Sequence, residues 1–257
     1  MFVDAASYER FMGRWSAVLA PGFLDAVDLG DGHGVVVDVG CGTGNLASAV
    51  LDRWPDASVV GVDPSEAFVE SARRRFGDSG FRGEVGYAAA LPLPDAAADA
   101  TLALLVLNFL PDPAAGVADM RRVTRPGGVV GATVWDYGGG MAMLRTYWDA
   151  AAAVRPDAAA VDEALASPAR AGGIEALFAG AGLTDVRGGL LEVGMRFETF
   201  DDYWRPFLLG IGPAGDFTRA LDDAGREALR AELLRRLGDG PVEMTSTARW
   251  VRGLVPA

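Results

Sequence analysis

Val37-Asp38-Val39-Gly40-Cys41-Gly42-Thr43-Gly44-Asn45 is the stretch of this 257-residue chain that decides its fold. The β-branched residues 35–37 lead into the glycines, and a helix-like segment, residues 46–54, follows them. Glycines at positions 40, 42 and 44 allow positive φ angles and let a ligand approach the backbone closely. A helix that begins near residue 46 turns its unpaired N–H groups and the positive end of its dipole toward that ligand. The stretch therefore predicts a strand, a turn and a helix that bind a nucleotide-sized ligand.

The spacing of the glycines separates two classes of ligand. Dinucleotide-binding turns follow the pattern G-x-G-x-x-G, in which the third small residue allows close packing of the helix. Asn45 stands in that place here, and the third glycine comes one residue earlier, at Gly44. The spacing disfavours NAD and FAD, so a nicotinamide- or flavin-dependent oxidoreductase is the weaker alternative. A plain turn that binds nothing is also disfavoured, because three glycines in five residues cost chain entropy.

Strands and helices alternate after the glycine loop. Apolar runs predict strands at residues 58–62, 84–87, 100–107 and 129–135, with helices at 46–53, 66–76 and 114–123 between them. Asp63 follows the second strand, where a carboxylate is suited to accept hydrogen bonds from both hydroxyls of a ribose. A cap on the next helix, completed by Glu66, is the alternative role for Asp63, and the two roles are compatible.

The C-terminal half is less regular. Three glycines at positions 138–140 precede a predicted helix, residues 141–154, whose aromatic stripe is typical of a core more often than of a substrate wall. Helical segments at 201–209 and 223–237 lie between strands predicted at 186–197 and 244–251. The connection that holds Tyr203, Trp204 and Phe207 is a candidate lid, because long excursions at the ligand edge of a compact domain tend to be functional.

Composition excludes several functional classes. Acidic residues outnumber basic ones by 35 to 23, and the net charge of −12 opposes the wrapping of a nucleic-acid backbone. Every basic residue is arginine, which excludes lysine Schiff-base chemistry from this chain. A single cysteine and a single histidine provide neither an internal disulfide nor a His/Cys metal cluster, so we expect no metal site. Half of the residues are apolar but no apolar run reaches membrane-spanning length, which predicts a cytoplasmic protein that makes no membrane contact.

The glycine loop also resembles that of a known family. Asp38 to Gly44 reads D-V-G-C-G-T-G, like the loop of the Rossmann-like, class I S-adenosylmethionine-dependent methyltransferases. Asp63, an Ala-Leu-Pro-Leu-Pro stretch, an apolar strand and an Arg-Pro-Gly-Gly turn at 125–128 then follow in an order similar to that of ubiquinone/menaquinone-type and other small-molecule methyltransferases. The likeness covers residues 35–135. The segment 8–15 looks like the leading helix of that group, which folds over the methionine end of the cofactor.

The resemblance implies a fold and a domain organisation. The expected fold class is α/β: a Rossmann-like, doubly wound, seven-stranded sheet, mostly parallel with one antiparallel strand near the C-terminus, plus helical lid insertions. The expected single domain comprises an N-terminal helical cap (1–30), a cofactor-binding core (35–135), and helical lid or substrate segments (138–182 and 200–240).

It also implies S-adenosyl-L-methionine as the cofactor and a set of residues that bind it. Those residues are Tyr8, Arg14, Trp15, Gly40, Cys41, Gly42, Thr43, Gly44, Asp63, Pro64, Ala88, Ala89 and Leu107. A guanidinium fork at Arg14 suits the carboxylate of the cofactor, although a surface arginine is the simpler explanation. Tyr87 departs from the family pattern, because relatives carry there an acidic residue that accepts from the adenine amino group. The Tyr87 ring either stacks on the ligand, accepts a hydrogen bond, or packs under the sheet.

The implied reaction is an in-line attack on a methyl group, for which the protein mainly aligns the partners. A base, if the acceptor needs one, must come from the ends of the fourth and fifth strands or from the lid. Asp136, Tyr137 and Asn108 are the candidates, although Asp136 is equally explained as a solvated turn residue. His33 lies before the first strand, away from the expected pocket, and the glycine turn itself explains Cys41. We expect a small-molecule substrate and a monomer or homodimer, with a cofactor-binding sensor or scaffold without turnover as the alternative.

Overall fold

The computed structural model describes residues 13–30, 34–165 and 171–257. A single seven-stranded sheet with strand order β3-β2-β1-β4-β5-β7-β6 forms its centre. The first five strands are parallel, and β7 runs antiparallel to both β5 and β6. This topology confirms the predicted fold class. The strands are β1 (Val35–Val39), β2 (Ser58–Asp63), β3 (Phe81–Val85), β4 (Ala98–Leu104), β5 (Thr124–Trp135), β6 (Thr184–Phe197) and β7 (Val242–Leu254).

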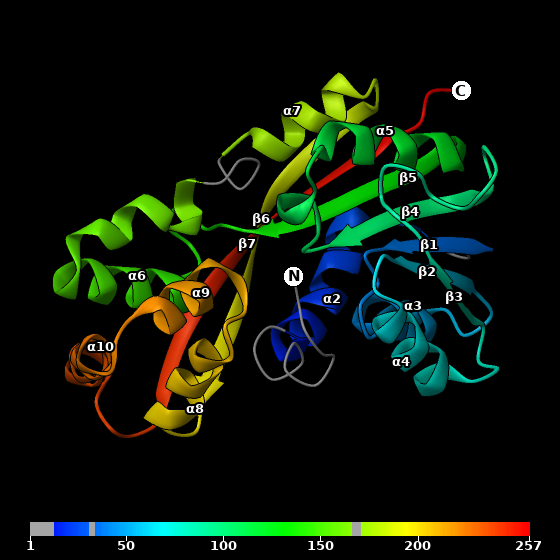
Figure 1. Cartoon of the computed structure of the whole chain (residues 1–257). Helices are drawn as coiled ribbons and strands as arrows, with labels where there is room; N and C mark the ends of the chain where they lie inside the picture. Colours follow the sequence, from blue (N-terminus) through cyan, green and yellow to red (C-terminus); the bar gives the residue numbers. More distant parts are fainter. Residues whose placement is uncertain (1–12, 31–33, 166–170) are drawn as a thin grey trace.

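Helices cover both faces of the sheet (Figure 1). On one face lie α2 (Arg14–Val27), α3 (Asn45–Arg53) and α4 (Glu66–Phe76), and on the other lie α5 (Pro113–Val123) and α7 (Gly173–Gly180). Successive side chains of a strand point to opposite faces, so Val36 packs in the cluster under α2 and Val37 in the cluster under α5. Because both faces are covered there, the central strand β1 is apolar at four of its five positions, as the sequence predicted, whereas β3, β6 and β7 also carry charged and exposed residues.

Three predicted boundaries at the sheet are wrong. Strand β3 begins at Phe81 and ends at Val85, and a turn closed by a bridge between Tyr87 and Ala90 takes the place of its predicted end. Strand β4 stops at Leu104 because the next residue has a positive φ. The Arg-Pro-Gly-Gly element, expected as a turn before the strand, lies inside β5, where the pairing with β4 shifts register. A bulge absorbs the proline, which cannot donate to the ladder.

A second set of helices forms a lobe of its own beside the sheet (Figure 1). We call it the helical lobe; it consists of α6 (Ala142–Val154), α8 (Phe200–Trp204), α9 (Gly212–Ala220) and α10 (Asp223–Leu237), with 3-10 turns at Pro156–Val161, Glu163–Leu165 and Arg205–Leu209. Strands β6 and β7 reach it by running past the rest of the sheet. Beyond the last β5 pair, Trp135 with Ala248, residues 242–247 of β7 pair in the sheet with residues 192–197 of β6 alone.

Aromatic side chains fill the helical lobe. Tyr147, Tyr203 and Phe207 are fully buried, and the rings of Tyr147 and Phe207 stack with their centroids 4.4 Å apart. The Tyr203 hydroxyl donates to the carbonyl of Met143 at 2.9 Å, which joins α8 to α6. The aromatic stripe of α6 is therefore core, the more common of the two interpretations. The aromatic residues of the candidate lid, Tyr203, Trp204 and Phe207, also form the interior of the lobe.

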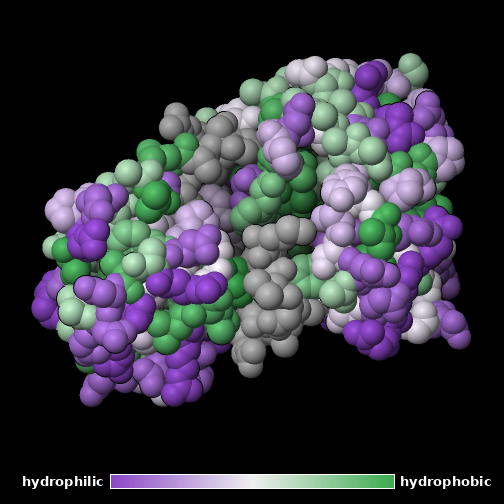
Figure 2. Space-filling model, viewed as in Figure 1, coloured by the Kyte–Doolittle hydropathy of each residue, from purple (hydrophilic) through white to green (hydrophobic). Residues whose placement is uncertain are grey.

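Figure 2 shows one face of the molecule, on which hydrophilic residues line much of the outer side of both lobes. Hydrophobic residues lie in the hollow between the lobes and also at scattered places on each lobe. Among the described helices, none combines the length and the apolar character that crossing a bilayer requires.

Candidate functional site

The glycine loop, residues 40–44, connects the carboxyl end of β1 to helix α3 and lies against the end of β2. Gly40, Gly42 and Gly44 have φ angles of 68°, 53° and 90°, which confirms the predicted positive-φ turn. The backbone N–H groups of Gly40 and Cys41 donate to the carbonyl of Val62 at 2.7 and 3.1 Å. The loop is therefore anchored to the neighbouring strand before helix α3 begins.

Two of the three glycines make room for the protein itself. A Cβ atom at Gly40 would lie 2.5 Å from a methyl group of Val106, and one at Gly44 would lie 2.4 Å from the ring of Phe76. The expectation that these glycines only let a ligand approach is thus incomplete. They also let the ends of β4 and α4 close onto the loop.

Asp63 holds the loop from the end of β2. Its Oδ2 accepts from the backbone N–H of Gly42 at 3.0 Å, and its Oδ1 accepts from that of Ser65 at 2.8 Å. Burial raises the pKa of this carboxyl, while the two backbone hydrogen bonds act to lower it. The N-cap of α4 is Ser65, whose Oγ accepts from Phe68, so the helix-cap role belongs to Ser65 and not to Asp63. Asp63 instead ties the glycine loop to the start of α4.

Asp38, inside β1, is a buried carboxyl that the sequence reasoning did not single out. Its Oδ2 accepts from the N–H of Ala47 in the first turn of α3 at 3.2 Å. Burial raises its pKa to about 7, the Ala47 hydrogen bond acts against this shift, and the nearby Asp63 adds to it. The signal available in the sequence was an acidic residue in the middle of an otherwise apolar strand.

Asn45 shows why this loop departs from the dinucleotide pattern. Its amide nitrogen donates to the carbonyl of Gly13 at 3.0 Å, and its oxygen accepts from Arg75 at 2.9 Å. The side chain thus connects α3 to the segment before α2 and to α4. A smaller residue in this place would lose both contacts.

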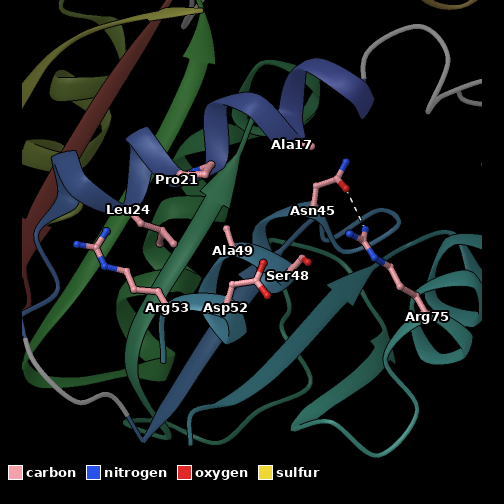
Figure 3. Close-up of a pocket in the computed structure, with 9 residues that line it drawn as sticks. All are labelled: Ala17, Pro21, Leu24, Asn45, Ser48, Ala49, Asp52, Arg53 and Arg75. Carbon is pink, nitrogen blue, oxygen red and sulfur yellow. Dashed lines mark hydrogen bonds between the residues drawn. The ribbon is translucent and has the colours of Figure 1, made fainter. Parts of the chain in front are cut away.

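Two cavities meet at Asn45. A cavity of about 400 Å³ opens between α2 and α3 on the outside of the loop (Figure 3), and it is lined by Ala17, Pro21, Leu24, Asn45, Ser48, Ala49, Asp52, Arg53 and Arg75. A much smaller polar cavity lies under the loop and is lined by Ser16, Asp38, Gly40, Cys41, Thr43, Asn45, Leu46 and Leu104. Of these two cavities, only the small one is lined by a glycine of the loop and by Asp38. A ligand bound by the loop is therefore expected at the small cavity and not in the larger one.

The end of β4 carries backbone strain. Leu105 is buried and has a φ of 61°, an angle that residues with a side chain rarely adopt. Its N–H donates to the carbonyl of Thr133 on β5 at 2.9 Å, which fixes the bend. The bend places Val106 against Gly40 and directs the 3-10 turn Leu107–Phe109 over the edge of the sheet.

Two of the three candidate catalytic residues come together at this edge. The amide nitrogen of Asn108 donates to the hydroxyl of Tyr137 at 3.3 Å, so the ends of β4 and β5 are bridged. The amide oxygen of Asn108 is buried and has no hydrogen-bond donor among the described residues. Such an acceptor is costly to leave unpaired.

The third candidate, Asp136, is bound elsewhere. Its Oδ2 accepts from Arg249 of β7 at 3.2 Å, and both side chains are mostly buried. Its carbonyl accepts the N–H groups of Gly140 and Met141, both at 2.9 Å. Asp136 therefore organises the turn before α6, and its carboxylate is engaged by Arg249.

Arg14 and Trp15 lie at the start of α2, between the two lobes. The Nη1 of Arg14 donates to both carboxylate oxygens of Asp202 at 3.2 Å. Its guanidinium lies over the rings of Trp15 and Phe197, at 4.3 and 4.7 Å from their centroids. The Nε and Nη2 of Arg14 are buried without an acceptor in the described part of the chain.

The other residues expected at the site differ in exposure. Cys41, Thr43, Ala88 and Leu107 are buried, whereas Pro64 and Ala89 are exposed. Burial raises the pKa of the Cys41 thiol, in agreement with a packing role. Tyr87 is 69% exposed, so the interpretation that it packs under the sheet is wrong. Tyr8 and His33 lie outside the described residues.

Comparison with known proteins identifies relatives of this region. The methyltransferase domain family matches residues 37–131. Trans-aconitate 2-methyltransferase of Azoarcus sp. is 39% identical over 100 residues, which are 39% of this chain and 38% of that protein. A ubiquinone/menaquinone biosynthesis C-methyltransferase of Desulfotalea psychrophila is 34% identical over 97 residues, 38% of this chain and 39% of that protein. The chain spans about two fifths of the length of these curated relatives.

A solved structure shares the whole fold. Phosphoethanolamine N-methyltransferase 2 of Haemonchus contortus, in complex with S-adenosyl-L-methionine, superposes with a TM-score of 0.61 at 15% identity and covers 98% of this chain and 57% of that one. The sequence matches confirm the resemblance over residues 37–131, and the solved structure confirms the fold.

Proposed function

We propose, from the premise that residues 37–131 are a methyltransferase domain, that this chain is an S-adenosylmethionine-dependent enzyme that methylates a small-molecule acceptor. One observation carries the proposal. The positive-φ loop after β1 is tied through Gly42 to Asp63 after β2, at the carboxyl edge where open α/β sheets bind ligands. The fold shared with a methyltransferase solved in complex with the cofactor supports it.

The residues present fit the nucleoside part of the cofactor. Each oxygen of Asp63 is engaged by one backbone N–H, and an ionised carboxylate oxygen accepts two hydrogen bonds. One acceptor position on each oxygen thus serves a ribose hydroxyl. The exposed ring of Tyr87 and the backbone of Ala88 and Ala89 lie on the next strand end, where we place the adenine.

The methionine part belongs at the start of α2. The buried nitrogens of Arg14 that lack an acceptor fit a carboxylate, and the N-terminus of α3 favours negative charge nearby. We assign the backbone of Gly40, Cys41, Gly42, Thr43 and Gly44 to the bound cofactor, and we place the buried side chains of Trp15 and Leu107 beside it.

The acceptor side is built from the ends of β4 and β5 and from the helical lobe. The bound cofactor supplies an electrophilic methyl group, so the chain's own task is to align the acceptor and to exclude water. We assign the alignment to Asn108 and Tyr137, because the unpaired amide oxygen of Asn108 accepts an N–H or O–H. Asp136 acts as a base only after Arg249 releases it. Residues 138–182 and 200–240 form the acceptor compartment.

Calorimetry tests the cofactor assignment. The protein is titrated with S-adenosylmethionine, with its demethylated product S-adenosylhomocysteine, and with NAD. We expect the product to bind at least about tenfold more tightly than NAD, a difference of about 1.4 kcal/mol. A preference for NAD would reverse the assignment in favour of an oxidoreductase.

A methyl-transfer screen tests turnover. Acceptors are offered with radiolabelled cofactor, beginning with trans-aconitate and quinone-ring compounds, since one relative is a trans-aconitate 2-methyltransferase and another a ubiquinone/menaquinone biosynthesis C-methyltransferase. Transfer to any acceptor that falls in Asp63→Ala at a limiting cofactor concentration supports an enzymatic function. Tight cofactor binding without transfer across a panel of oxygen, nitrogen and carbon nucleophiles would instead favour a sensor or scaffold.

A further inference from the structure

An ion pair joins the cofactor-binding part of the chain to the helical lobe. Arg14 opens helix α2, and Asp202 lies in α8, more than 180 residues later in the chain. Their side chains are 31% and 36% exposed, so the pair is partly shielded from solvent. A contact of this kind makes one lobe sensitive to the position of the other.

The pair uses only one end of the guanidinium. Asp202 engages Nη1 with both of its oxygens, whereas Nε and Nη2 are buried with no acceptor among the described residues. Nε and Nη2 form the side edge of the fork, which matches a carboxylate with two parallel hydrogen bonds. Leaving two buried donors of a cation unpaired costs free energy, so this edge of the guanidinium favours the binding of an anion.

Aromatic rings hold the guanidinium in its plane. Trp15 and Phe197 both lie within 5 Å of it, and the two rings contact each other edge to face at 5.2 Å. Cation–π contacts of this type stabilise an arginine without using its hydrogen-bond donors. The orientation of the side edge then depends on the group that fixes Nη1, which is Asp202.

Asp202 is itself fixed by the start of α8. The side chain of Thr199 accepts from the N–H of Asp202 at 3.1 Å, and Asp202 Oδ2 accepts from the N–H of Glu198 at 3.2 Å. This arrangement is a variant of a capping box, so the carboxylate has little freedom. Asp202 is therefore a rigid support and not a mobile surface charge.

Arg14 also lies next to the glycine loop. The residue before it, Gly13, accepts a hydrogen bond from Asn45 at the start of α3, and Ser16 lines the small cavity under the loop together with Asp38 and Gly40. A carboxylate on the side edge of Arg14 thus belongs to a ligand that lies on the loop.

We propose that Asp202 is a positioning residue for cofactor binding: the helical lobe uses it to hold Arg14 so that the Nε and Nη2 edge receives the carboxylate of the cofactor's amino-acid tail. The proposal rests on the proposed function and adds to it a contribution of the acceptor lobe to cofactor affinity. Asp202 does not touch the cofactor.

Two ligands separate this role from a general effect on stability. S-adenosylhomocysteine carries the carboxylate tail, and 5′-methylthioadenosine has the same nucleoside and sulfur without it. In calorimetry of the full chain, we expect Arg14→Ala to lower the affinity for S-adenosylhomocysteine more than about tenfold. The affinity for methylthioadenosine should change less than about twofold. We expect Asp202→Ala to lower the affinity for S-adenosylhomocysteine about threefold to fivefold, the range for one partly exposed ion pair. The affinity for methylthioadenosine should again be unchanged.

Two further variants separate orientation from charge. Asp202→Asn keeps an oxygen that accepts from Nη1 and removes the negative charge, so it should bind S-adenosylhomocysteine at least as tightly as the natural chain. Asp201→Ala is the matched control, because Asp201 lies in the same helix and pairs with Arg205 and Arg230 and not with Arg14. Neither ligand should lose affinity in this control.

The outcomes that overturn the proposal are distinct. If Asp202→Ala binds S-adenosylhomocysteine as tightly as the natural chain, or more tightly, Asp202 is only a competing charge. If Asp202→Ala weakens both ligands equally, its role is structural. If the natural chain binds neither ligand, the proposed function fails and not only the positioning role.

Discussion

Single side chains decide how the carboxyl edge of the sheet is organised, and Asp63 is the clearest case. Its two oxygens hold the glycine loop and the start of α4, and the same oxygens are proposed to hold the ribose. A residue with both tasks should show a loss of ligand affinity together with a loss of stability when it is replaced.

Replacing Asp63 with alanine tests this double role. We expect the affinity for S-adenosylhomocysteine to fall by about 1–3 kcal/mol, because ligand hydroxyls lose their acceptor, and the melting temperature to fall as well. Asp99→Ala is the control: Asp99 also accepts from a backbone N–H, that of Val35 at 2.8 Å, and pairs with Arg125, but it lies at the opposite edge of the sheet. The control should lose stability only, and an equal loss of affinity in both variants would contradict the ribose role.

Asp38 gives the protein a pH dependence. Its pKa is raised by burial from 3.8 to about 7, so the folded protein binds a proton that the unfolded chain releases at lower pH. A group with a raised pKa contributes stability that is complete below about pH 4 and is lost as pH rises through about 7. Within this window the free energy of unfolding contributed by Asp38 falls by up to about 1.4 kcal/mol per pH unit.

Asp38→Asn isolates that contribution. The amide is neutral at every pH and its oxygen still accepts from Ala47, so the variant should lack the decline. Urea unfolding at pH 5, 6, 7 and 8 measures the difference in unfolding free energy between the natural chain and the variant. We expect the difference to shift in favour of Asp38→Asn as pH rises, and a constant difference would show that Asp38 stays charged when buried.

At the scale of helices and strands, local signals gave correct boundaries for the two helices that have both an N-cap side chain and a C-terminal glycine. The predicted helices 66–76 and 223–237 match α4 and α10, which begin after the N-caps Ser65 and Asp222 and end before Gly77 and Gly238. The predicted helix 201–209 is instead α8 followed by a 3-10 turn, and the errors in β3, β4 and β5 occurred where the outcome depends on pairing with a neighbour. The register shift that places Pro126 inside β5 is a property of the β4 and β5 pair and has no signal in either segment alone.

The same contrast between local signals and long-range pairing applies to the candidate site. The glycine loop and Asp63 were predictable because strand, turn and helix signals are consecutive. The pairs of Asp136 with Arg249 and of Arg14 with Asp202 were not, since each joins segments more than 100 residues apart. The bend at Leu105 was also hidden, because nothing in its residue type favours a positive φ.

The contact between α8 and α6 can be tested with one hydroxyl. Tyr203→Phe removes the donor to Met143 inside the helical lobe without creating a cavity. We expect the free energy of unfolding to fall by about 1 kcal/mol, the usual net value of such a bond. Tyr87→Phe is the control. Because the Tyr87 side chain is mostly exposed, this substitution should leave stability unchanged. Chemical denaturation of both variants makes the comparison, and a loss in the control as large as in Tyr203→Phe would argue against the contact.

At the scale of the molecule, the two lobes share one core. A single buried cluster runs from Phe23 and Ala47 beneath α2 and α3 to Tyr203 and Leu233 in the helical lobe, and β6 and β7 pass through both. We therefore expect one cooperative unfolding transition. Far-ultraviolet circular dichroism and tryptophan fluorescence should give coincident melting curves, since tryptophans lie in both lobes at positions such as 54 and 148. Two separated transitions would show that the lobes fold independently.

The overhanging ribbon of β6 and β7, residues 192–197 paired with 242–247, sets the distance between the central sheet and the helical lobe. Adding two residues to each strand of this ribbon would move the helical lobe outward by about 7 Å, and the inward and outward alternation of side chains would be preserved. The five central strands would keep their register throughout such a change. Under the proposed function, the compartment for the acceptor could thus be enlarged without changing the residues proposed to bind the nucleoside.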